Sequence, residues 1–184
     1  QTKVEGPADG NGVRADTTFT FTLEQGVRRM DTASGACPTC NGPTFQDIDY
    51  DPQTGFRTRE VDLNGNVTLL KHNAAGLETC RLEGIPGSGI APAYRLIKTD
   101  WNTALRVATE KRIYEYQPSD PPGDAPTTCS ETDFNLVQTI TSMYATDPLD
   151  SDYGRLLSRK ITDAAAPGSP RETIYAYYQQ GEQD

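Results

Sequence analysis

The sequence lacks any long hydrophobic run. No stretch approaches the roughly 18 consecutive apolar residues that a membrane-spanning helix needs, and only 35% of the 184 residues are hydrophobic. Basic residues are also few, with 17 Lys and Arg against 26 Asp and Glu and a formal net charge of -9, and they form no cluster. The sequence therefore predicts neither a membrane nor a nucleic acid as a partner.

Signature motifs of common enzymes are missing as well. The chain contains no P-loop, HExxH, GxGxxG or Gly-x-Ser-x-Gly motif. His72 is the single histidine, so any Ser-His or Cys-His pair would have to use it. Its flanks have the pattern of a strand that runs into a turn, which favours a structural or surface role. We predict no enzymatic activity, no catalytic residue and no cofactor, with a small hydrolase or metal-dependent enzyme using His72 or an acidic loop as the weaker alternative.

The residues that could bind a metal are poorly spaced for it. Cys37 and Cys40 form a C-x-x-C pair, but Cys80 and Cys129 stand alone, and no helical pattern follows Cys40 as a thioredoxin-like motif would require. Buried small hydrophobic residues and disulfides remain the two interpretations, with the pairing left open. The stretch 147–154 places three Asp residues before a glycine but lacks the downstream Glu of a calcium loop. We therefore predict no metal site.

The sequence pattern is mainly that of short strands joined by turns. The chain has 16 glycines and 13 prolines without a regular period, and alternating or β-branched segments predict strands. These segments are 18–23, 27–30, 46–50, 56–61, 66–72, 77–82, 94–101, 105–109, 113–116, 137–144, 155–162 and 171–178. A helix over 104–116 is the alternative for that part. The pattern predicts an all-β fold in which successive antiparallel β-hairpins form a curved, repeat-type sheet.

The domain organisation follows from the same pattern. Residues 1–17 are rich in Gly, Asp and Asn and predict a flexible or irregular lead-in. Residues 18–184 form the hairpin region, which a Pro-rich loop at about 117–133 interrupts. Because the chain begins at Gln1 rather than at Met, we expect a piece processed or excised from a longer chain.

Several turns share one order of residues. Tyr50-Asp51 is followed by Gly55-Phe56 and then by the run 62–68, which reads Asp-Leu-Asn-Gly-Asn-Val-Thr. The next stretch, 72–79, repeats the order with His-Asn in place of Tyr-Asp, and a partial third copy begins at Tyr153-Gly154-Arg155. Over about residues 19–180, this series resembles the tyrosine-aspartate (YD) repeat of RHS proteins. The structural motif positions are Tyr50, Asp51, Gly55, Asp62, Gly65, Asn66, Gly76, Trp101, Gly154, Arg155 and Tyr175.

The resemblance implies a function. In that family the repeats spiral as an antiparallel β-sheet into a hollow shell that encloses a C-terminal toxin or effector of a bacterial polymorphic toxin. The implied partners are the rest of the parent chain, namely adjacent repeats and the enclosed toxin domain, and also secretion machinery or cell-surface glycans. The implied localisation is secreted, or delivered by a bacterial secretion system. Since the Gly-rich self-cleavage region of the family has no counterpart, we expect this piece neither to cleave itself nor to carry the toxin.

A carbohydrate- or cell-surface-binding β module is the alternative function. It rests on the tyrosines near the end of the chain, because aromatic rings in a sheet can stack on sugars. These are Tyr175, Tyr177 and Tyr178.

Overall fold

The described part of the chain is built from β-strands alone. A computed structural model describes residues 1–8, 10–12, 14–35, 45–62, 65–85, 94–117 and 128–177. Its twelve strands are β1 (Thr2–Ala8), β2 (Arg14–Glu24), β3 (Val27–Gly35), β4 (Phe45–Tyr50), β5 (Arg57–Val61), β6 (Val67–His72), β7 (Glu78–Ile85), β8 (Arg95–Asn102), β9 (Val107–Tyr116), β10 (Phe134–Tyr144), β11 (Leu156–Asp163) and β12 (Arg171–Ile174).

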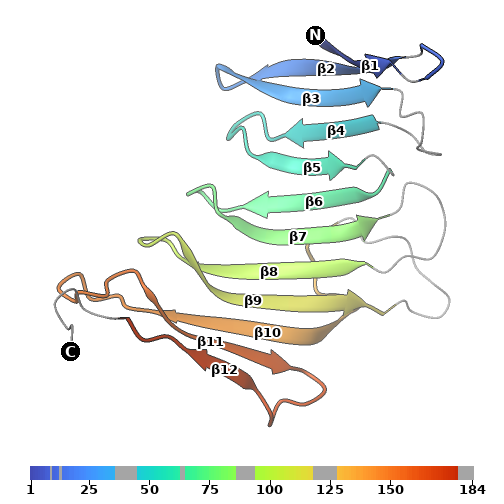
Figure 1. Cartoon of the computed structure of the whole chain (residues 1–184). Helices are drawn as coiled ribbons and strands as arrows, with labels where there is room; N and C mark the ends of the chain where they lie inside the picture. The colour runs from blue at the N-terminus through green and yellow to red at the C-terminus, as the bar shows by residue number, and fades with distance from the viewer. Residues whose placement is uncertain are drawn as a thin grey trace.

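The strands form one sheet in chain order. Each strand pairs antiparallel with the next, from β1 to β12, without a crossover (Figure 1). This arrangement follows from the sequence, because antiparallel neighbours can be joined by tight turns, whereas parallel strands need long crossover connections. The predicted all-β class and its succession of antiparallel hairpins are confirmed.

The first strand lies where the sequence predicts an irregular lead-in over residues 1–17. β1 pairs with β2 through the register Thr2↔Phe19 and Val4↔Thr17, and Lys3 Nζ lies 2.7 Å from the Asp16 carboxylate. Val4 is 51% exposed, so β1 is a polar edge strand. Because its pairing comes from backbone hydrogen bonds rather than from apolar alternation, the strand carries no hydrophobic pattern that could predict it.

β9 is a single strand, although the sequence predicts two short strands or a helix over 104–116. It pairs with β8 through Leu96↔Tyr114 and with β10 through Phe134↔Tyr116. Pairing on both sides uses the backbone groups that a helix would satisfy internally. The helix alternative is wrong for this reason.

The main buried cluster lies across β7 to β10. Its members, which we call the aromatic cluster, are Cys80, Leu82, Tyr94, Leu96, Tyr114 and Phe134, with Tyr116 packed beside them. The rings of Tyr94 and Tyr116 meet edge to face with centroids 4.9 Å apart. Leu82 and Leu96 lie opposite each other in the register and have no exposed surface. Apolar burial is therefore strongest at the middle of the sheet.

The sheet is open rather than folded onto a second layer. The accessible surface of the chain is 12325 Å², whereas a compact protein of this mass would expose about 8,700 Å². The larger surface agrees with twelve strands that lie in one sheet.

Candidate functional site

Five hairpin turns lie at the same end of the strands. They join β2 to β3, β4 to β5, β6 to β7, β8 to β9 and β10 to β11, and Figure 1 shows them on the left. Their residues are 25–26, 51–56, 73–77, 103–106 and 145–155, and we call them the turn stack. Most of the predicted motif positions fall within it or beside it.

Asp51 organises the second turn of the stack. Its Oδ1 accepts hydrogen bonds from the backbone N–H groups of Gln53 and Thr54 at 2.8 and 2.9 Å. Its own N–H donates to Phe56 O at 2.8 Å, and the Gly55 N–H donates to Asp51 O at 2.7 Å. The bonds from Thr54 and Gln53 stabilise the charged carboxylate and hold the pKa of Asp51 below its usual value. The carboxylate therefore shapes the turn and is already engaged by the backbone.

Asn73 plays the same part in the third turn. Its Oδ1 accepts from the N–H groups of Ala75 and Leu77, each at 3.0 Å, and its N–H donates to Leu77 O at 2.9 Å. An amide oxygen can replace a carboxylate oxygen as the acceptor at this position. The His-Asn pair therefore still provides a side-chain oxygen that accepts two backbone N–H groups of the turn, although the second donor is Leu77, four residues on, instead of the residue three positions on.

The turn of Asp62 joins β5 to β6 at the other end of the strands. It repeats the hydrogen bonds of the Asn73 turn. Asp62 Oδ1 accepts from the Asn66 N–H at 2.8 Å, and the Asn66 side chain donates to Asp62 Oδ2 at 2.8 Å. The Gly65 N–H donates to Asp62 O at 3.0 Å, and Gly65 has a φ of 80°. The motif residues of this turn thus hold one another in place.

Neighbouring turns of the stack contact one another. Gln25 Nε2 donates to Pro52 O at 2.7 Å. The Phe56 ring covers Gly76 so closely that an added Cβ would lie 2.8 Å from the ring. Arg106 Nη1 donates to Ala75 O at 3.2 Å. The first four turns are therefore linked in succession by these three contacts.

Two further motif residues link strands instead of turns. The Tyr50 hydroxyl donates to Met30 O at 2.9 Å, with the Arg29 guanidinium 5.3 Å from the ring centroid. Trp101 Nε1 donates to Glu78 O at 2.8 Å. Both aromatic side chains thereby fix the end of one strand to the preceding hairpin.

The last three motif residues lie at the C-terminal end of the sheet. Gly154 closes the fifth turn, where its N–H donates to Ala145 O at 2.8 Å. Arg155 pairs with Asp152 at 2.7 Å and lies 4.8 Å above the centre of the Tyr177 ring. The Tyr175 N–H donates to Leu157 O at 2.9 Å, and its side chain is 38% exposed. The structure thus places these residues together around the fifth turn and β12.

Sequence reasoning missed the side chains that connect one turn to the next. Gln25 and Arg106 belong to no repeat motif, and their contacts depend on how the twist of the sheet aligns separate hairpins. Arg106 also has a φ of 55°, unusual for a non-glycine residue. Phe56 follows a motif glycine, which is the one local signal that could have identified it.

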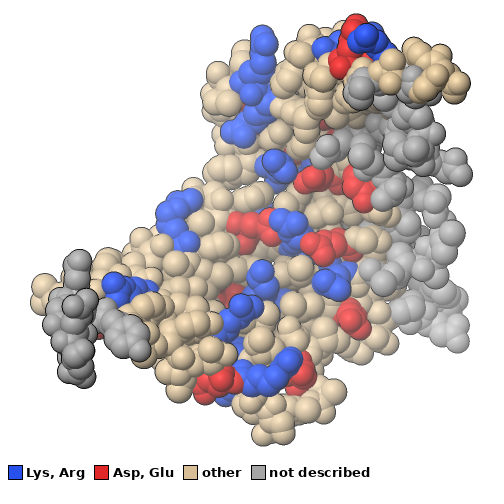
Figure 2. Space-filling view, viewed as in Figure 1, with Lys and Arg blue, Asp and Glu red and all other residues tan. Residues whose placement is uncertain are grey.

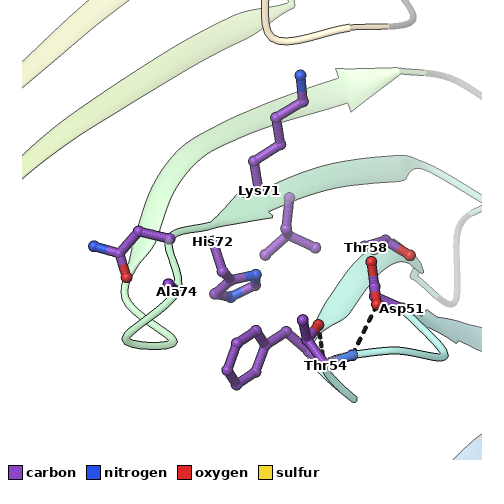
Figure 3. A pocket seen from close by; sticks show the side chains of 9 residues that line it. Asp51, Thr54, Thr58, Lys71, His72 and Ala74 are labelled. Carbon is purple, nitrogen blue, oxygen red and sulfur yellow. Dashed lines mark hydrogen bonds between the residues drawn. The ribbon is translucent and has the colours of Figure 1, made fainter.

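His72 lies in a shallow pocket of about 270 Å³ between the second and third turns (Figure 3). Its ring packs against Phe56, with centroids 5.4 Å apart. Asp51 borders the same pocket, but its carboxylate points to the backbone of its own turn (Figure 3). Within the described residues no hydrogen bond joins His72 to Asp51, so the pocket shows no catalytic pair.

The acidic loop 147–154 uses its carboxylates internally. Asp147 Oδ1 accepts from the Leu149 N–H and Asp150 Oδ1 accepts from the Asp152 N–H, both at 2.9 Å. Asp152 pairs with Arg155. Across the described ranges, no group of three or more His, Cys, Asp or Glu side chains could hold a metal ion.

Two of the four cysteines form a disulfide. Cys80 on β7 is bonded to Cys129, 49 residues further along the chain. The C-x-x-C pair, Cys37 and Cys40, lies outside the described residues.

Charged side chains of opposite sign lie beside one another on the face seen in Figure 2. Arg59 contacts Asp47 at 2.9 Å and Asp49 at 3.2 Å. Arg81 contacts Glu78 at 2.8 Å, and this hydrogen bond raises the pKa of the guanidinium. Arg59 on β5 therefore partly neutralises two aspartates of the neighbouring strand β4.

No known family model matches the chain, and no curated protein matches its sequence. In the part of the chain that the structure describes, there is no helix that could cross a membrane.

Proposed function

We propose that this chain is a structural segment of an RHS-type secreted toxin of bacteria, in which its sheet forms part of a β-shell around a C-terminal toxin or effector. The observation that carries the proposal is the turn stack. Its second, third and fifth turns carry the motif residues at 50–55, 72–76 and 153–155, and its hairpins follow one another in one sheet without a crossover.

The open form of the sheet supports a wall rather than a self-contained binding domain. A single-layer sheet leaves much of both faces and both outer strands accessible, and such surfaces become stable when further strands or a cargo cover them. The proposal gives the chain no catalytic residue and no cofactor. Its partners are the adjacent repeats and the enclosed domain.

The disulfide between Cys80 and Cys129 supports a secreted destination. Disulfides persist in oxidising compartments and are rare in the cytosol. A segment that is exported or displayed outside the cell agrees with this chemistry.

Protease protection of the intact parent protein tests the proposal. We expect a tagged C-terminal segment to survive proteinase K while the protein is native and to be digested after heat denaturation, because the shell excludes the protease. Digestion of the segment at the same rate in both states would show that nothing is enclosed.

A glycan-binding module is less well supported. Tyr175 and Tyr177 are 38% and 37% exposed, but Arg155 lies over the Tyr177 ring and the Tyr177 hydroxyl donates to Leu156 O at 2.7 Å. One face of the Tyr177 ring is thus already covered by Arg155. Binding of the isolated chain to a glycan array, lost on Tyr175→Ala, would favour this alternative over the shell.

A further inference from the structure

The segment before β10 folds back over the sheet. Residues 128–133, which we call the strap, follow the long connection from β9, and Figure 1 shows them in orange crossing behind β7 and β8. Cys129 packs against the aromatic cluster. The strap therefore covers part of the most deeply buried region of the molecule.

Several contacts hold the strap, and one of them is covalent. Cys129 is bonded to Cys80. Glu131 accepts from Lys98 Nζ at 2.6 Å, and Gln117 and Phe134 make backbone hydrogen bonds with Asp133 and Glu131. The Lys98 and Glu131 side chains are 27% and 45% exposed, and an ion pair this open to water contributes little. The disulfide is thus the strongest restraint on the strap.

The two cysteine residues differ in exposure. Cys80 is 5% exposed and belongs to the aromatic cluster, whereas Cys129 is only half-buried on a strap whose other residues are exposed. We therefore expect a small thiol to reach the disulfide from the side of Cys129 while the sheet stays folded. Attack on Cys80 would require the cluster to open first.

We propose that the Cys80–Cys129 bond is a thiol-reducible latch that keeps the strap closed over the aromatic cluster in an oxidising compartment and releases it in a reducing one. A thiolate attacks Cys129 Sγ, the S–S bond breaks, and Cys80 leaves as a thiolate that takes up a proton. A second small thiolate then attacks the sulfur of the first in this mixed disulfide, so that Cys129 leaves as a thiolate and takes up a proton. The net reaction converts one protein disulfide and two small thiols into two cysteine thiols and one small disulfide. The latch does not depend on the proposed shell function.

Hydrogen–deuterium exchange of the whole chain tests the latch. The variant Cys37→Ser/Cys40→Ser leaves Cys80 and Cys129 as its only cysteines, so every thiol released comes from this pair. After treatment with dithiothreitol, we expect amides of the strap and of the adjoining part of β8 to exchange at least tenfold faster. Exchange in β2 to β6 should stay unchanged, as should the far-ultraviolet circular dichroism.

Adding Cys129→Ser to this background provides the matched variant. It should show the fast strap exchange without any reductant and should not respond to dithiothreitol. Unchanged strap exchange after complete reduction would mean that packing alone holds the strap. Faster exchange in every strand, or a Cys129→Ser variant that does not fold, would mean that the bond supports the whole sheet. Each of these three results would overturn the latch.

Discussion

Asp51, Asp62 and Asn73 each begin a turn by accepting backbone N–H groups with a side-chain oxygen. Such local hydrogen bonds favour turns over continued strands, because they satisfy donors that would otherwise need a partner strand. These three side chains thus help to set where the chain reverses in their own turns.

Gly76 meets two separate constraints, and substitution can distinguish them. Its φ is 75°, and an added Cβ would lie 2.8 Å from Phe56, so Gly76→Ala combines backbone strain with a clash. We expect it to lower the free energy of unfolding by about 2–4 kcal/mol. Gly65→Ala, with a φ of 80° and open space around it, should cost only about 1–2 kcal/mol.

Urea denaturation measures the free energy of unfolding of Gly76→Ala and Gly65→Ala, with Gly168→Ala as the control. Gly168 has neither a positive φ nor an atom within 4 Å of an added Cβ, so its substitution should be nearly neutral. Equal losses in the free energy of unfolding for Gly76→Ala and Gly65→Ala would contradict the packing of Phe56 on Gly76.

The carboxylate of Asp51 should make its turn sensitive to acid. The N–H groups of Thr54 and Gln53 lower its pKa in the folded protein, so the contribution to stability is present above the unfolded-state pKa of about 3.9. That contribution is lost as the pH falls through the lower, folded pKa. Carboxyl titration by NMR should give a midpoint for Asp51 below that of an unfolded peptide, and a midpoint at or above the peptide value would refute the hydrogen bonding described.

At the scale of single strands, stability concentrates in β7 to β9. The aromatic cluster spans these strands and the start of β10, while β12 at the outer edge has only exposed residues. The elements at the middle of the sheet should therefore be the last to open, and the edge strands the first.

Substitution of Leu96 on β8 tests whether the middle strands contribute more to stability than the exposed parts of the sheet. It has no exposed surface, so Leu96→Ala should lower the free energy of unfolding by about 2–5 kcal/mol through lost burial and a residual cavity. Leu149, which is 94% exposed in the fifth turn, provides the matched control, and Leu149→Ala should change stability by less than about 0.5 kcal/mol. Similar losses in the two variants, measured by thermal or urea unfolding, would place the core elsewhere.

The whole molecule is a long sheet with two charged outer strands. Lys3 and Glu5 lie on β1, and Arg171 and Glu172 lie on β12. Charges on edge strands oppose uncontrolled pairing with other chains. The charges on β1 and β12 therefore make the outer strands less prone to pair with other chains.

Small-angle X-ray scattering should show the extended shape. Eleven spacings between twelve strands give a sheet about 53 Å wide, whereas a compact domain of this length would have a radius of gyration of about 16 Å. We expect a monomer in dilute solution with a radius of about 18 Å or more, because the mass is spread over one layer. A value near 16 Å would mean that the sheet folds onto itself.

The sequence by itself determined the strand class, most of the strand positions and the turns. Alternation along a strand and the pairing of Asp or Asn with a following Gly are local patterns, readable from a few consecutive residues such as 50–56. Tertiary structure decided the contacts between distant residues. These are the pairing of β1 as a polar edge strand, the packing of Phe56 on Gly76, the hydrogen bond from Arg106 to the neighbouring turn, and the disulfide between Cys80 and Cys129. These contacts depend on the register and twist of the whole sheet, which no local pattern specifies.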